Sequence, residues 1–247
     1  MHNISDFSSS LKTAGFNLIR IIFLIALIYG SSTLYMTKEV KELYNNQFGN
    51  RHIYLTNISL YLTITTMLLG ITVSILQTKI IIDFMHKIDR RIKKKTFNKI
   101  YTTALFTTLC LEILVTLLYW PLRIFKPTLL SARQDPEYQT PIFPNHCIHT
   151  IPLISMIYEC FTRKIIYSRC TRISTIISTG IFSIFYYTWG YISSIYNKQW
   201  PYPLLTNMNG ILRMIFIHSV CIIGLVLGYG VVNTIIWIKN RFKIEHK

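Results

Sequence analysis

The chain has 247 residues, of which 51% are hydrophobic, and its 26 Lys and Arg outnumber its 10 Asp and Glu to give a formal net charge of +16. Mean hydropathy is +0.37, and the connections between apolar stretches are too short to form a soluble domain, so we expect one helical membrane domain over residues 1–247. Most of the positive charge lies beside these stretches, where anionic lipid attracts it, which argues against nucleic acid as a partner.

Six stretches reach the length of about 20 mostly apolar residues that a helix needs to cross a bilayer. In chain order they are residues 16–37, 53–77, 100–120, 142–161, 173–197 and 212–238. Three of them carry a single charged residue each within the apolar stretch, namely Arg20, Glu112 and Glu159, while Arg213 is the second residue of the last range. We expect the long Arg20 side chain to extend to the interface, and Glu159, near the end of its span, either to lie at the interface or to have a function. Glu112 lies mid-span and is a functional candidate because a carboxylate in the bilayer is costly.

The distribution of Lys and Arg predicts the orientation of these spans. The N-terminus and the loops on its side carry 17 Lys and Arg, whereas the loops on the other side carry 7. Cytosolic loops carry the excess of positive charge, so both termini should be cytosolic, with the run from Lys87 to Lys99 forming a cytosolic loop. Seven of the eight prolines fall in or beside non-cytosolic loops, while Pro152 interrupts the fourth span and frees the carbonyl of Ile148.

Three distant segments place polar and aromatic side chains at the non-cytosolic face. Thr56 lies at the mouth of the second span. His146 and His149 enter the fourth span one turn apart. Trp200 and Tyr202 follow the fifth span. An imidazole titrates near neutral pH and is suited to general-base catalysis, so the histidines indicate chemistry at this face.

Each of these features also has an ordinary interpretation. The histidine pair suits helix capping, water binding or weak metal binding, although no third ligand accompanies it at metal-like spacing. Aromatic side chains commonly anchor membrane interfaces, and threonines commonly form interhelical hydrogen bonds. The residues alone therefore do not single out Thr56 among the threonines of its span.

Three short motifs resemble those of the androgen-induced protein family of six-span membrane hydrolases. They are Tyr-Leu-Thr at residues 54–56, Asn-His-x-x-His-Thr at residues 145–150 and Trp-x-Tyr-Pro at residues 200–203. The resemblance implies that Thr56 and His149 are the catalytic pair, that no cofactor is needed, and that the substrates are fatty acid esters of hydroxy fatty acids. It also implies a location in the endoplasmic reticulum or another cell membrane.

These observations together predict an all-α, polytopic hydrolase with Thr56 as nucleophile and His149 as base. We expect His146 or Asn145 to supply the hydrogen bonds that orient His149. The expected partners are the lipid bilayer and a membrane lipid substrate, bound by the aromatic side chains of residues 200 and 202. No metal is expected, and the sequence does not set the oligomeric state. The alternative is a non-enzymatic transporter, channel or scaffold, with the two histidines and Glu112 lining a polar path.

Overall fold

The computed structural model describes residues 2–76, 90–163 and 168–242, and these residues form helices without strands. The long helices are α1 (His2–Ser31), α3 (Leu55–Leu76), α5 (Arg90–Phe125), α8 (Arg169–Asn197) and α10 (Gly210–Arg241). The shorter ones are α2 (Lys38–Asn45), η1 (Asn50–Ile53), η2 (Pro127–Leu129), η3 (Pro136–Tyr138), α6 (Ile142–His149), α7 (Ile151–Thr162) and α9 (Pro203–Thr206). The predicted all-α class is confirmed for this part of the chain.

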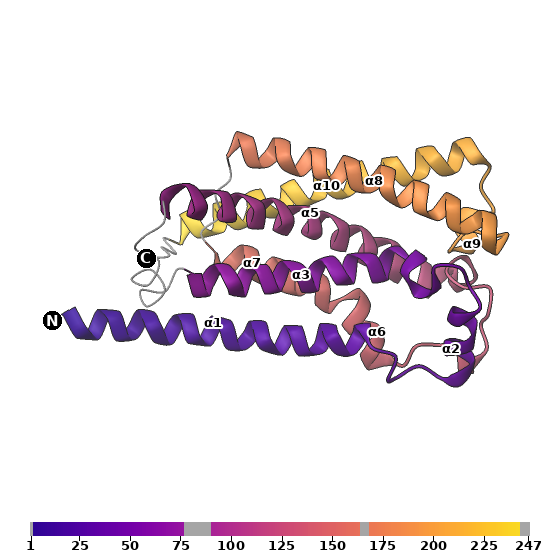
Figure 1. Ribbon diagram of the computed structural model, residues 1–247, viewed down its shortest axis with the longest axis horizontal. Coiled ribbons are helices and arrows are strands. Elements are labelled where there is room, and N and C mark those ends of the chain that lie inside the picture. The colour runs from indigo at the N-terminus through magenta and orange to yellow at the C-terminus, as the bar shows by residue number, and fades with distance from the viewer. Residues whose placement is uncertain (1, 77–89, 164–167, 243–247) are drawn as a thin grey trace.

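Helix α5 is the centre of the bundle and contacts α8 and α10 on one side and α3 and α7 on the other (Figure 1). Helix α1 packs outside α3, α6 and α7. The start of α1 and the end of α10 lie at one end of the bundle, which we call the terminal end, while α2, α6 and α9 lie at the opposite end (Figure 1). Helix α10 approaches α5 closely at Gly224, where an added Cβ would meet the Cys110 carbonyl at 2.8 Å.

The outer surface of the bundle is apolar, which is the pattern of a membrane protein. Large apolar side chains such as Ile25 on α1, Ile181 on α8 and Ile222 on α10 are more than half exposed. The buried face of α8 consists instead mainly of small and hydroxyl-bearing residues: Thr171, Thr175, Thr179, Ser183, Gly190 and Ser193. Small residues let membrane helices pack closely while apolar side chains face lipid.

Four helical segments in the described chain are long and apolar enough to span a membrane. They are Ala14–Ser31, Leu55–Ser74, Thr96–Phe125 and Gly210–Arg241. The predicted multi-pass membrane protein is therefore supported, whereas the predicted set of six spans is not confirmed. Helix α8 is long, but its hydroxyl-bearing residues keep it out of this group, and residues 142–161 are not one continuous helix.

The fourth predicted span is divided into α6 and α7 at Thr150. Pro152 lies in the first turn of α7, and because it has no N–H, the Ile148 carbonyl lacks the donor that a continuous helix would give it. The Thr150 N–H still donates to the His146 carbonyl at 3.0 Å, and its own carbonyl accepts from Ile154 at 3.2 Å. The break leaves His149 as the last residue of α6.

Two predicted boundaries are wrong. The run from Lys87 to Lys99 is not a loop from residue 90 onward, because α5 begins at Arg90, and residues 87–89 lie outside the described chain. Lys and Arg favour helix, so α5 continues through the charged residues. The first predicted span ends at Ser31 and not at residue 37, because the chain turns there to reach α2.

Candidate functional site

A cavity of about 530 Å³ lies among α2, α3, α5, α6, α8, α10 and the connecting segments at the end opposite the terminal end. Four of the six predicted site residues line it, namely Thr56, His149, Trp200 and Tyr202. Because these residues come from three separate segments, their meeting depends on the tertiary fold. Asn145 and His146 do not line the cavity.

Thr56 is positioned by the start of α3. The segment before it forms the short helix η1, after which the backbone of Tyr54 is extended and α3 begins at Leu55. The Thr56 Oγ1 atom lies 3.4 Å from the Tyr202 hydroxyl oxygen. Thr56 is partly buried, so its hydroxyl is next to the cavity and also accessible to a ligand there.

His149 is held by stacking and by its backbone. Its ring lies parallel to that of Tyr119, with 3.3 Å between centroids and 5° between planes. The Thr116 hydroxyl donates to the His149 carbonyl at 2.8 Å. The side chain is only 8% exposed, and its Nδ1 atom has no hydrogen-bond partner within the described residues. Thr56 and His149 therefore share the cavity without a hydrogen bond between them in the described structure.

Asn145 is connected to His149 through Tyr119. The Tyr119 hydroxyl donates to Asn145 Oδ1 at 2.6 Å, and the same ring carries the stacked imidazole of His149. A buried amide in hydrogen-bond contact with a phenol fixes the rotation of that ring. The predicted hydrogen bond from Asn145 to His149 is not present among the described residues, and the two are connected only through Tyr119.

His146 is directed away from the cavity. Its Nδ1 atom lies 3.1 Å from Thr150 Oγ1, and its ring centroid is 5.0 Å from that of Trp120. The Trp120 indole N–H donates to the same threonine hydroxyl at 3.2 Å. The structure therefore brings His146 to an exposed contact with Trp120 and Thr150, and not to His149.

Trp200 forms a fixed part of the cavity wall. The Arg213 guanidinium carbon lies 4.4 Å from the centroid of the Trp200 ring, and the indole is 6% exposed. Gly190 of α8 makes room for it, because a Cβ at that position would lie 2.7 Å from the indole. The adjacent Tyr202 packs edge-to-face on Tyr54, with 5.5 Å between ring centroids.

Seven tyrosines line the cavity, and Tyr202 is the one that the sequence predicted as a site residue. Those lining it are Tyr35, Tyr44, Tyr54, Tyr119, Tyr138, Tyr186 and Tyr202. The chain contains 16 tyrosines at no regular spacing, so the pattern alone did not single these out. The hydroxyl of Tyr186 is buried and has no hydrogen-bond partner among the described residues.

The charge in the cavity wall is positive. Arg123 and Arg133 line it, and no carboxylate from the described residues does so. Arg123 donates to Gln139 Oε1 at 2.8 Å, which holds its guanidinium group at the rim. A cationic rim above an aromatic wall suits a ligand with both an anionic group and apolar chains.

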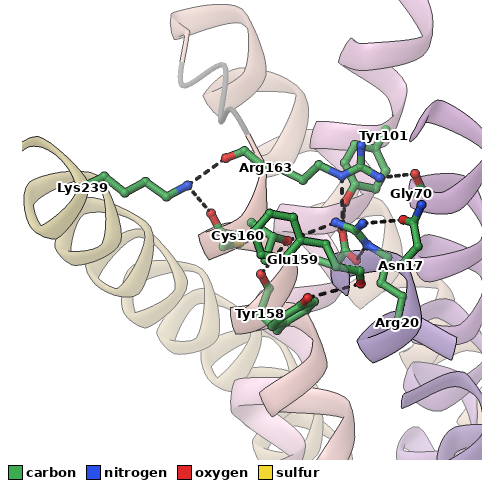
Figure 2. Close-up of polar contacts among 11 residues, drawn as sticks. Asn17, Arg20, Gly70, Tyr101, Tyr158, Glu159, Cys160, Arg163 and Lys239 are labelled. Carbon is green, nitrogen blue, oxygen red and sulfur yellow. Dashed lines mark hydrogen bonds and ion pairs between the residues drawn. The ribbon is translucent and has the colours of Figure 1, made fainter. Parts of the chain in front are cut away.

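A second polar cluster lies near the terminal end, centred on Glu159 (Figure 2). The Glu159 carboxylate is fully buried and accepts hydrogen bonds from Arg20 of α1 and from the Tyr101 hydroxyl of α5. Arg163 adds a contact of 3.5 Å. The expectation that Arg20 extends to the interface is wrong, because it is 2% exposed and paired with Glu159. Glu159 is likewise not interfacial.

The same cluster ties further helices together (Figure 2). Arg163 donates to the Gly70 carbonyl of α3. Lys239 of α10 donates to the carbonyls of Cys160 and Arg163, each at 2.7 Å, at the end of α7. With its donors and acceptors paired, this cluster has the character of a structural connection between five helices.

Glu112 is isolated from both regions. It is fully buried in α5, where one carboxyl oxygen accepts from the Thr63 hydroxyl at 2.7 Å and the other has no partner within the described chain. Neither Glu112 nor His146 lines the cavity that contains His149. The described side chains therefore do not support a polar path through these three residues. They also contain no group of three or more His, Cys, Asp or Glu placed to hold a metal ion.

Comparison with known sequences identifies one family. The model of the family described as FAR-17a/AIG1-like protein matches residues 18–235, which include all three motifs and extend from α1 into α10. Searches of curated proteins and of solved structures give no match.

Proposed function

This chain belongs to the FAR-17a/AIG1-like protein family, and on that premise we propose that it is an integral membrane hydrolase of long-chain fatty acid esters. The proposed substrates are fatty acid esters of hydroxy fatty acids, which places the protein in lipid metabolism. The observation that carries the proposal is that Thr56 and His149, from different helices, line the same cavity. The two sequence motifs that suggested catalysis thus meet at a single site.

The chemistry begins with Thr56 as the nucleophile. His149 removes the hydroxyl proton as Oγ1 attacks the ester carbonyl carbon, giving a tetrahedral intermediate. The intermediate collapses, and its ester C–O bond breaks. The leaving alkoxide takes the proton from His149 and departs as the hydroxy fatty acid, which leaves an acyl-threonine. Water then attacks the acyl-threonine and gives its proton to His149. The proton returns to Thr56 as the second fatty acid departs, so the enzyme is regenerated without a cofactor.

The surrounding residues supply orientation and binding. Tyr119, held by Asn145, supports the plane of the His149 ring, in a site where no carboxylate performs that task. Trp200 and Tyr202 form an aromatic wall for the acyl chains. Arg123 at the rim is suited to the free carboxylate that a hydroxy fatty acid ester carries.

We further propose that α1, α3, α5, the α6 and α7 pair, α8 and α10 cross the membrane, with both chain termini in the cytosol. Residues 142–162 cover about 30 Å at 1.5 Å per residue, which matches the bilayer core. The apolar outer face of α8 and the positions of α1 and α10 in Figure 1 favour this topology.

The topology is tested with epitope tags in sealed microsomes. Tags at either terminus should be cleaved by protease added outside, whereas one beside His52 should be protected. Protection of the terminal tags would reverse the assignment. The endoplasmic reticulum is the proposed location, and co-localisation with a marker of that membrane in intact cells tests it.

Hydrolysis is tested with purified protein, p-nitrophenyl palmitate and the palmitoyl ester of hydroxystearic acid. Thr56→Ala and His149→Ala should each abolish turnover and labelling by a fluorophosphonate probe, while Thr56→Ser should keep part of both. Thr65→Ala is a matched control, because Thr65 is exposed on the same helix and its hydroxyl donates to the Tyr61 carbonyl. Full turnover in Thr56→Ala would remove the covalent mechanism. A wild-type protein that cleaves no long-chain ester would favour the transporter or scaffold alternative.

A further inference from the structure

The start of α3 presents N–H groups that are not bonded within the helix beside the proposed nucleophile. The first N–H groups of a helix have no partner within the helix. Those of Asn57 and Ile58 donate to the Tyr54 carbonyl, at 3.1 and 3.2 Å. The N–H groups of Leu55 and Thr56 instead lie beside the Tyr202 oxygen. The positive end of the α3 dipole is therefore directed at the place where Thr56 would react.

Two tyrosine hydroxyls lie at the same place. The Tyr202 oxygen is 3.4 Å from Thr56 Oγ1. Tyr186 of α8 belongs to the same packed cluster as Tyr202 and Leu55, is only 4% exposed, and lines the cavity. The Leu55 N–H lies beside its oxygen, but its hydroxyl makes no full hydrogen bond among the described residues. Buried phenol groups usually find a partner, so one without a full hydrogen bond in a cavity wall indicates a position for a ligand oxygen.

We propose that the hydroxyls of Tyr202 and Tyr186, together with the N–H of Thr56, form the oxyanion-binding site of this protein. The site takes the carbonyl oxygen of an ester and stabilises it when it becomes negative in the tetrahedral intermediate. This inference rests on the proposed function. Under this proposal the Tyr202 hydroxyl contacts the reacting carbonyl oxygen, whereas the sequence predicted only that Tyr202 binds substrate. Tyr186 is a further residue of the site.

The geometry suits the developing charge. In the tetrahedral intermediate the oxyanion and Thr56 Oγ1 are bonded to the same carbon, so a donor 3.4 Å from Oγ1 can approach the oxyanion at about 2.7–3.1 Å. When Thr56 attacks, its oxygen becomes bonded to the substrate and no longer contacts Tyr202 as a hydroxyl. The Tyr202 phenol proton is then available to the substrate oxygen. The donors are fixed before the reaction begins, which is the condition under which an oxyanion site contributes most to the rate.

The protonation state of Tyr202 agrees with a donor role. Burial raises the pKa of Tyr202 to about 12, and this effect outweighs the opposing influence of the Thr56 hydroxyl and the N–H groups at the start of α3. An unperturbed tyrosine ionises near pH 10, so Tyr202 keeps its proton at a pH at which an exposed tyrosine begins to lose its proton. A protonated phenol can donate to an oxyanion but is a poor base, which leaves the base role to His149.

The test uses Tyr202→Phe and Tyr186→Phe, which remove one hydroxyl each and preserve the rings. We expect kcat for p-nitrophenyl palmitate to fall about 100-fold in Tyr202→Phe, with KM nearly unchanged. In Tyr186→Phe we expect a fall of about tenfold, the equivalent of one hydrogen bond. Tyr191→Phe is the matched control, because Tyr191 is exposed on the same helix and lies outside the cavity.

Two inhibitors separate oxyanion stabilisation from a structural effect. A long-chain trifluoromethyl ketone forms an oxyanion when Thr56 adds to it, whereas an ether of the same length has no carbonyl. Affinity for the ketone should fall in both variants by factors close to the loss of kcat/KM, with ether affinity unchanged. Unchanged ketone affinity, or an equal loss for ketone and ether, would overturn the inference for the residue concerned. If either variant fails to fold, the other still tests the site.

The same assay separates failure of this inference from failure of the proposed function. If Thr56→Ala abolishes turnover while both tyrosine variants keep wild-type kcat, the hydrolase stands and the tyrosine site is wrong. If Thr56→Ala turns over substrate normally, the covalent mechanism fails, and the oxyanion site that depends on it fails as well.

Discussion

The two ends of the helix bundle differ in whether their buried polar groups have hydrogen-bond partners. At the terminal end, the Glu159 carboxylate accepts hydrogen bonds from Arg20 and Tyr101 and contacts Arg163, and the cluster around it connects five helices (Figure 2). At the cavity end, His149 Nδ1 and the Tyr186 hydroxyl are buried without partners in the described chain. Satisfied polar groups stabilise a fold, whereas buried unsatisfied groups cost free energy unless a ligand completes them. The contrast separates a region built for stability from one built for binding.

The largest effect is expected for the substitution Glu159→Ala at the terminal end. It leaves the buried Arg20 guanidinium without its anion, so we expect the free energy of unfolding to fall by about 3–5 kcal/mol. Thermal unfolding of purified protein in detergent measures the loss, and turnover per folded molecule should remain close to wild type. Glu42→Ala is the control, because its contact with Lys38 is exposed and should contribute little. A variant of normal stability that lost turnover would show that the cluster is part of the active machinery.

An intermediate effect is expected for Gly190→Ala, at the cavity end. The new methyl group would lie 2.7 Å from the Trp200 indole, which also contacts the Arg213 guanidinium group. Overpacking of this kind costs about 1–3 kcal/mol, and displacement of Trp200 should slow turnover of long-chain esters more than that of short ones. Gly180→Ala is the matched control on the same helix, since a Cβ there meets open space. Equal slowing of long and short esters would show that Trp200 does not contact the acyl chain.

The smallest effect in this series is expected for Tyr119→Phe. This change keeps the ring that stacks on His149 but leaves the buried Asn145 oxygen without its donor, at a cost of about 1 kcal/mol. Turnover should fall only a fewfold, because the imidazole keeps its support. Tyr119→Ala removes the ring itself and should reduce turnover much further. Equal turnover in the two variants would mean that the stack does not orient His149.

Local sequence patterns predicted the helical class well and the helix ends less well. The apolar run from residue 53 to 77 corresponds closely to α3, because a run without charge specifies a buried or lipid-facing helix by itself. The start of α5 was placed ten residues late, because hydropathy marks the bilayer and not the end of the helix. Pro152 signalled the break before α7 through its missing N–H, but its position alone did not say how the chain would turn.

Tertiary contacts account for what the sequence did not predict at the site. Thr56 and His149 were chosen through motifs, and the fold brings both to one cavity. The stack of Tyr119 on His149 joins residues from different helices and has no local signature. The pairing of Arg20 with Glu159 is equally non-local, so Arg20 was predicted to be interfacial, and Glu159 to be either interfacial or functional. Short-range rules identify candidate residues, while their partners depend on helix packing.

The hydroxyl-rich inner face of α8 has a consequence for how the protein is made. Insertion of a helix by the translocon depends largely on its apolar content. The polar residues of α8 face the bundle, and only its outer side faces lipid. We therefore expect α8 to insert poorly on its own and to be retained until α10 arrives as its partner. A chain truncated before residue 210, carrying a glycosylation site after α8, should be glycosylated less completely than the full chain. Equal glycosylation of both would show that α8 inserts independently.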